Sequence, residues 1–79
     1  MDWKARIVAD PDVLQGKPCI RGTRISVEWI LDRLSSGWDT PTLVEAYPHL
    51  SADDVQAALA FAAELIRDER YVAAGKTAA

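Results

Sequence analysis

Three helix-start signals after residue 25 constrain the fold more than any other feature of the sequence. A side-chain oxygen just before a helix accepts a hydrogen bond from its first turn, and proline at the first helical position sacrifices no hydrogen bond. Glycine and proline, in turn, end helices. The start signals are Ser26, Thr40 followed by Pro41, and Ser51, and the breakers between them are Gly37 and Pro48. The sequence therefore predicts a mainly α fold with three short helices, the second of roughly two turns.

Apolar residues recur at three- and four-residue spacing in the first and third of these segments, as on the buried face of a helix. The predicted core stripes are Val27, Ile30, Leu31 and Leu34 in the first helix, and Val55, Ala58, Leu59, Ala62, Leu65 and Ile66 in the third. A second stripe of the third helix is Ala57, Ala60, Phe61 and Glu64. Because this second stripe is small apart from Phe61, we expect another helix to approach it closely.

The first 25 residues predict a short β-arm or small sheet. Residues 3–8 alternate apolar and charged side chains, which is typical of a half-buried strand, and residues 10–12 end it with turn chemistry. A second extended piece is expected around residues 18–20, followed by a tight turn in which Gly22 supplies a positive φ. The single domain is therefore divided into a β-arm with a basic loop (1–25), a helix-turn-helix bundle (26–70) and a flexible tail (71–79).

Composition limits the classes of function. A chain of 79 residues has room for one domain of modest stability, and a hydrophobic content of 49% with three tryptophans suggests that some apolar surface meets a partner. Cys19 is the only cysteine, so no intrachain disulfide forms, and no segment has the ~20 apolar residues that span a bilayer. The net charge of -3 disfavours attraction of the whole surface to nucleic acid. We expect a cytoplasmic protein without a membrane partner.

The most unusual segment is residues 14–25, where three long basic side chains project from a backbone rich in glycine and proline. Such an arm is suited to grip phosphates or an acidic pocket. The residues expected to bind a toxin or nucleic acid are Lys17, Arg21, Gly22, Thr23 and Arg24. The alternative is that these cations form weak surface ion pairs with Asp10, Asp12, Glu28 or Asp32.

A short helix, a turn and a longer helix make a helix-turn-helix pattern, although many small helical domains with this order do not touch DNA. In the usual docking mode the first residues of the second motif helix enter the major groove. Here those residues include Asp53 and Asp54, whose carboxylates repel phosphates. Any DNA contact therefore has to come from the basic arm, or from Lys4 and Arg6 on the first strand.

Catalytic and metal chemistry find little support in the sequence. His49 is the only histidine and sits in a proline-containing turn, so neither a metal site nor a nucleophilic triad can be assembled around it. Cys19 lies among β-type residues and is expected to be a small buried hydrophobe. We expect no enzyme activity, no cofactor and no metal.

Aromatic side chains and the first strand point to an interface. Trp29 and Trp38 flank the first helical stripe and are expected at the edge of the core, with use at an interface as the alternative. The first strand leaves an open edge unless it is covered or paired with another chain, which favours a homodimer. The expected interface residues are Trp3, Ile7, Trp29 and Phe61.

Several motifs together carry a resemblance to a known family. They are Gly16-Lys17-Pro18-Cys19-Ile20-Arg21-Gly22-Thr23-Arg24-Ile25, Val27, Gly37, Tyr47-Pro48-His49-Leu50 and Asp53-Asp54-Val55. On these residues the chain resembles the domain-of-unknown-function 433 (DUF433) family from about Ile7 to Ile66. The Gly-Lys-Pro and Arg-Gly-Thr-Arg elements are specific to that family, while Cys19 stands where an aliphatic residue is expected.

Members of that family are small prokaryotic proteins with a homeodomain-like helical core, regarded as VapB-type antitoxins paired with PIN-like ribonuclease toxins. The resemblance implies a trihelical homeodomain-like core and a type II antitoxin that neutralises its toxin and, as a homodimer, represses its own operon by binding operator DNA. PIN-like nucleases hold a metal in a cluster of carboxylates. Arg21 or Arg24 inserted there would compete with the metal and with RNA phosphate.

Two other functions remain open. A stand-alone dimeric helix-turn-helix transcriptional regulator would bind a specific operator without any second protein. An enzyme would show a turnover that is abolished by changing Cys19 or His49, and it is the alternative with the least support.

Overall fold

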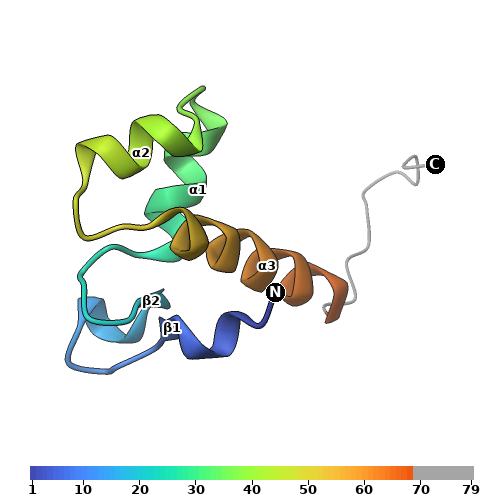
Figure 1. Cartoon of the computed structure of the whole chain (residues 1–79). Coiled ribbons are helices and arrows are strands. Elements are labelled where there is room, and N and C mark those ends of the chain that lie inside the picture. Colours follow the sequence, from blue (N-terminus) through green and yellow to red (C-terminus); the bar gives the residue numbers. More distant parts are fainter. Residues whose placement is uncertain (69–79) are drawn as a thin grey trace.

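The computed structural model describes residues 1–68 and shows three helices preceded by a small two-stranded antiparallel sheet (Figure 1). The elements are η1 (Trp3–Ala5), β1 (Ile7–Val8), η2 (Leu14–Gly16), β2 (Cys19–Ile20), α1 (Val27–Ser35), α2 (Thr40–Ala46) and α3 (Ala52–Asp68), where η denotes a 3-10 helix. The predicted mainly α fold with a small N-terminal sheet is confirmed. The predicted tail, residues 71–79, lies outside the described residues, as do residues 69–70 of the predicted bundle. None of the helices within residues 1–68 is long and apolar enough to cross a membrane.

Local capping chemistry sets the ends of α1 and α3, as predicted. The Ser26 hydroxyl accepts a hydrogen bond from the Trp29 backbone N–H at 2.9 Å, and Gly37 takes a φ of +101° after the last turn of α1. At the start of α3 the Ser51 hydroxyl accepts from the Asp54 N–H at 3.1 Å. The Asp54 carboxylate in turn accepts from the Ser51 N–H at 3.0 Å. This reciprocal pair is a capping box that holds the first turn of α3, where the Asp54 N–H also reaches the Ser51 carbonyl at 3.0 Å.

The predicted cap of α2 was wrong by one residue. Asp39, not Thr40, precedes the helix, and its carboxylate accepts a hydrogen bond from the Thr42 N–H at 2.9 Å. Hydrogen bonds from the Thr42 hydroxyl and backbone lower the pKa of Asp39. A carboxylate caps as well as a hydroxyl and also suits the positive end of the helix dipole, so Thr40 becomes the first helical residue. The helix ends at Ala46, shortly before Pro48, as expected.

The core lies where the three helices and the sheet meet. Its buried members are Ile7, Ile20, Val27, Ile30, Leu43, Leu50, Val55, Ala57 and Ala58. The predicted core stripe of α3 was wrong at Leu59, Leu65 and Ile66, which are 41%, 52% and 64% exposed. Figure 1 shows why for the last two: α3 runs well past α1 and α2, so those helices do not cover its second half.

The predicted strand over residues 3–8 is correct only at its end. Asp2 accepts a hydrogen bond from the Lys4 N–H at 3.0 Å and Arg6 N–H donates to the Trp3 carbonyl at 2.9 Å, so residues 3–5 form η1. This turn lays the Trp3 ring against Phe61 of α3, with ring centroids 4.8 Å apart, edge to face. The short strand that follows pairs Ile7 with Ile20 and Val8 with Cys19. Phe61 and Glu64, two residues of the second stripe of α3, are thus contacted by a 3-10 turn of the N-terminal segment.

Candidate functional site

The turn between β2 and α1, residues 20–25, is held rigidly by the backbone. Its ends are joined by the Ile20 N–H, which donates to the Ile25 carbonyl at 2.9 Å, and by the Thr23 N–H, which donates to the Ile20 carbonyl at 3.0 Å. Gly22 has a φ of +80°, as predicted. The Thr23 hydroxyl donates to the Ile20 carbonyl at 2.8 Å and accepts from the Ile25 N–H at 2.9 Å. Gly22 and Thr23 therefore shape this turn rather than offering free groups to a ligand.

Arg21 and Arg24 both lie in this turn, and both are exposed. Arg21 also donates from Nε to the Ala5 carbonyl at 3.0 Å, which anchors its stem to η1. Neither arginine takes part in any ion pair found within residues 1–68. The predicted surface pairing is seen only for Lys17, whose Nζ lies 3.3 Å from Glu28 Oε1. Two guanidinium groups outside the ion pairs of residues 1–68 therefore stand on one turn, and that of Arg21 is held by a hydrogen bond to the backbone.

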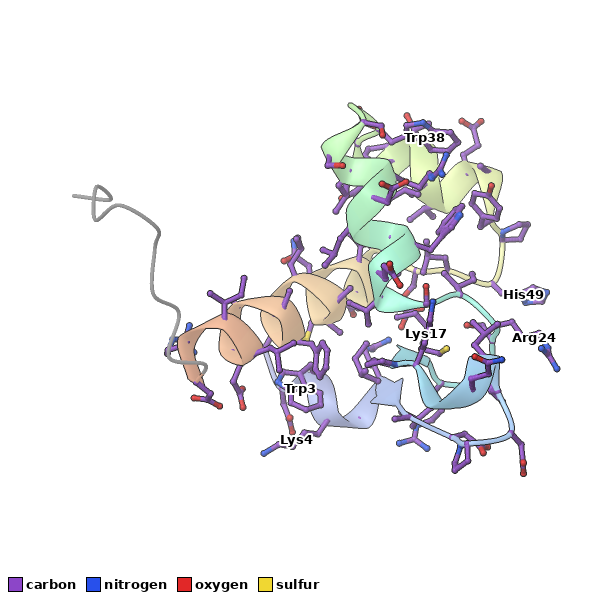
Figure 2. All side chains as sticks on the ribbon, turned by 180° about the vertical axis from the view of Figure 1, so that it is seen from behind. Trp3, Lys4, Lys17, Arg24, Trp38 and His49 are labelled. Carbon is purple, nitrogen blue, oxygen red and sulfur yellow. The ribbon has the colours of Figure 1, made fainter. Side chains whose placement is uncertain are left out.

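A groove of about 650 Å³ opens beside the turn, and we call it the basic groove. It is lined by Leu14, Gln15, Lys17, Arg24, Ile25, Ser26, Trp29 and Tyr47. Trp29 and Tyr47 meet edge to face with ring centroids 4.8 Å apart. Figure 2 shows Lys17 and Arg24 on the same side of the molecule, with Arg24 pointing outward. The groove thus combines an apolar, aromatic floor with a cationic rim.

One wall of the basic groove is made by backbone in an unusual conformation. Leu14 and Gln15 have φ values of +48° and +58°, and Gly16 follows at +85°. Side chains other than glycine rarely adopt this left-handed region, and each such residue costs about 1–3 kcal/mol. Strain of this kind persists where the surroundings enforce it and is concentrated at binding sites.

The structure places Lys4 and Arg6, the expected DNA phosphate contacts, in different roles. Arg6 binds the first turn of α3, with Nη1 3.0 Å from Asp54 Oδ1 and Nη2 3.5 Å from Asp53 Oδ2. Its charge is therefore already compensated by the aspartates that were expected to repel DNA. Lys4 is exposed, and its Nζ lies 5.9 Å from the centre of the Trp3 ring.

The four expected interface residues mostly contact the chain itself. Ile7 is only 6% exposed and belongs to the core, so little of it is left for a partner. Trp3 and Phe61 pack on each other, and Trp3 Nε1 also donates to Glu64 Oε1 at 3.0 Å. Trp29 packs against the core, as its position at the core edge predicted.

Cys19 and His49, the two side chains considered for catalysis, lie in different surroundings. Cys19 is buried, as predicted. Burial raises the pKa of its thiol, and this effect outweighs the positive charges of Arg24 and Lys17, which lower it. His49 is exposed in the turn between α2 and α3 and points outward in Figure 2. Within residues 1–68 no three histidine, cysteine or acidic side chains gather closely enough to hold a metal ion.

Comparison with known proteins gives the family. A sequence model described as "Protein of unknown function (DUF433)" matches residues 7–62. The chain belongs to the DUF433 family. It is 33% identical over 67 residues to Uncharacterized protein y4eO of Sinorhizobium fredii (strain NBRC 101917 / NGR234). That alignment covers 84% of this chain and only 30% of the length of that curated relative.

The fold is similar to a crystal structure of a DUF433 member protein from Anabaena variabilis ATCC 29413. The TM-score is 0.74 and the identity 31%, and the match covers 78% of this chain and 61% of that chain. The 20–25 turn and all residues of the basic groove lie inside the range that the DUF433 model matches, whereas Trp3, Lys4, Leu65 and Ile66 lie outside it. The candidate site is therefore part of the DUF433 segment itself.

Sequence reasoning missed several residues of this DUF433 site. Tyr47 was treated only as part of a turn, yet it closes the basic groove against Trp29. Arg33 was not singled out in the sequence, yet its guanidinium carbon lies 5.2 Å from the centre of the ring of Trp29, which lines the groove. The spacing of four between Trp29 and Arg33 on one helix face was an available signal. No sequence signal could have predicted the left-handed backbone at Leu14 and Gln15, because neither residue type favours that conformation.

Proposed function

We propose that this DUF433 chain is an antitoxin that binds a PIN-like ribonuclease and blocks its carboxylate cluster with Arg21 or Arg24. The observation that carries the proposal is the rigid turn on which both guanidinium groups stand exposed, outside the ion pairs of residues 1–68. Guanidinium groups bind carboxylates bidentately, and a fixed turn limits the entropy lost on binding. Both properties suit an arm that enters an acidic pocket.

A stand-alone dimeric transcriptional regulator is the second candidate. The order α2, turn and α3 favours it, because this is the order of a helix-turn-helix motif. The first turn of α3 opposes it, since Asp53 is 67% exposed and Arg6 is already bound to the aspartates there. In the antitoxin proposal, repression of the chain's own operon would use the same surface as this candidate.

The test is neutralisation of the nuclease encoded beside this chain, co-expressed with it. Replacing both Arg21 and Arg24 with alanine is expected to weaken nuclease binding by about a hundredfold or more, since removing one partner of a buried charge pair costs about 2–5 kcal/mol. Light scattering of the copurified complex and a ribonuclease assay measure this loss. Arg67→Ala, on the last turn of α3, is the matched control and should neutralise normally.

Unchanged neutralisation by the double variant would contradict the proposed role of the arm. A chain that copurifies with no nuclease but shifts its own promoter DNA as a dimer would favour the regulator. In that case the double variant should bind the promoter DNA more weakly, and its DNA affinity should depend less steeply on salt concentration, because two phosphate contacts are lost.

We further propose that the chain forms a homodimer through the exposed apolar face of α3. Leu59, Leu65 and Ile66 project there, next to an apolar groove of about 290 Å³ between α1 and α3. That groove is lined by Pro18, Val27, Glu28, Leu31, Phe61, Ala62 and Leu65. Across a two-fold axis, the exposed apolar side chains of one copy can pack into the apolar groove of the other, and the reverse.

Replacing Leu65 and Ile66 with glutamate is expected to convert the dimer to a monomer, because two charges would be buried without partners. Light scattering gives the mass directly. Gln56→Glu adds charge at an exposed position of the same helix and should leave the mass unchanged. A monomeric unsubstituted chain would rule out this homodimer.

A further inference from the structure

We propose that the basic groove is a binding site for a short acidic peptide segment of a partner protein, which seats an apolar side chain on the floor and places carboxylates against Lys17 and Arg24. This goes beyond the proposed function, because Arg21 is not part of the groove and the segment need not come from a nuclease active site. The volume of about 650 Å³ lies within the range of sites that take small ligands or a few side chains.

The floor of the groove is preformed and apolar. Trp29 and Tyr47 hold each other edge to face across the contact between α1 and the end of α2, and Ile25 and Leu14 extend the apolar surface. Trp29 is fixed further because its backbone N–H donates to the buried Ser26 hydroxyl. A floor that is already ordered loses little entropy when a side chain lands on it.

The rim of the groove is positively charged and available. Arg24 has no ion-pair partner among residues 1–68. Lys17 pairs with Glu28 at 3.3 Å, but the two side chains are 57% and 77% exposed, so their pairing is weak and easily exchanged. A carboxylate of an incoming segment that also fills the floor would therefore displace Glu28. Two cations at the edge of an apolar floor match a segment in which acidic and apolar residues alternate.

A nucleic acid fits the same groove less well. Arg33 already lies over the Trp29 ring, 5.2 Å from its centre, so a base cannot stack on the face that Arg33 occupies. Exposed carboxylates also stand two residues before two groove-lining residues in the chain, Asp12 before Leu14 and Glu45 before Tyr47. These charges would repel a polyanion that runs past the groove.

The strained loop supports the same site. Leu14 and Gln15, in left-handed conformation, both line the groove. The conformation is held by hydrogen bonds from the Gly16 N–H to the Val13 carbonyl and from the Lys17 N–H to the Leu14 carbonyl. Backbone strain of this kind is concentrated at binding sites, which favours a binding role for the groove.

The test is an NMR titration of the full chain, labelled with ¹⁵N, using a capped hexapeptide of alternating glutamate and leucine. We expect the amide and indole signals of Trp29 to shift saturably, while those of Trp3, which packs against α3 far from the groove, stay in place. Arg24→Glu and Lys17→Glu should each weaken binding about fivefold or more. Arg67→Glu makes the same charge reversal at an exposed position outside the groove and should bind as the unsubstituted chain does.

Three results would overturn the proposal. The Trp29 signals do not move, or Arg67→Glu weakens binding as much as Arg24→Glu, or a single-stranded hexathymidylate binds more tightly than the peptide. The variant Arg21→Ala separates this site from the proposed antitoxin arm. It should leave peptide binding intact, because Arg21 does not line the groove. Loss of peptide binding in Arg21→Ala would therefore contradict the groove site, whereas unchanged neutralisation by the double variant would contradict the antitoxin arm.

Discussion

Leu43→Ala is expected to lower the free energy of unfolding by about 2–5 kcal/mol. Leu43 is fully buried and is the one buried residue of α2, a helix of seven residues that is too short to persist without packing. A domain of this size has a total stability of only about 4–12 kcal/mol, so the loss is large. Urea denaturation followed by tryptophan fluorescence measures it.

Val44→Ala is the matched control for this prediction, because Val44 is the next residue of α2 and only half-buried. Its expected cost is below about 1.5 kcal/mol. Equal costs for the two variants would show that Leu43 does not anchor α2. Since α2 leads into Tyr47, Leu43→Ala should also abolish the saturable peptide shift at Trp29.

Asp54→Ala is expected to cost about 2–3 kcal/mol, the second-largest effect. Asp54 is buried, accepts a hydrogen bond from the Ser51 N–H at 3.0 Å, and binds Arg6 at 3.0 Å. The substitution removes a cap worth about 1 kcal/mol and leaves the guanidinium of Arg6 without its nearest partner. Thermal and urea unfolding both report the loss.

Asp53→Ala is the matched control, because Asp53 lies 3.5 Å from the same guanidinium but its side chain is 67% exposed. Its cost should stay within about 0.5 kcal/mol. A double-mutant cycle of Asp54→Ala with Arg6→Met should give a coupling of about 1 kcal/mol or more. Strict additivity would mean that the Arg6 contact contributes nothing to stability.

The Asp54 contact links the fold to the proposed binding surface. Arg6 carries the charge that ties the N-terminal segment to α3, and its carbonyl accepts a hydrogen bond from the Arg21 N–H at 2.8 Å. The 20–25 turn is thereby anchored to α3 through Arg6. Loosening this connection by Asp54→Ala should raise amide exchange in the turn, even though the substitution lies outside it.

The helix boundaries were readable from the sequence where short-range chemistry sets them. Ser26, Gly37 and Ser51 act within one helical turn of their own position, so their neighbours in the chain suffice to predict the result. The same holds for Gly22, whose turn closes over three residues. Thr40 was mistaken for the cap of α2 because Asp39 beside it caps equally well.

The errors lie where distant parts of the chain meet. Periodicity placed Leu65 and Ile66 in the core, but α1 and α2 cover only the first half of α3, and Trp3 of η1 packs on Phe61 and Glu64 instead. Alternation predicted a strand at Trp3, but the docking of its ring on Phe61 and Glu64, about 60 positions away, favours a 3-10 turn.

The candidate site divides in the same way. Arg21 and Arg24 stood out in the sequence because a cluster of cations, glycine and proline is visible without any structure. The basic groove could not be predicted from the sequence, since its floor joins Trp29 of α1 to Tyr47 after α2. Its wall also needs left-handed backbone at Leu14 and Gln15, which do not favour that conformation. Local hydrogen bonding and periodicity depend on neighbours in the chain and were therefore predictable. Burial, ion-pair partners and the groove depend on how far the packed helices reach, which emerges only when they meet in three dimensions.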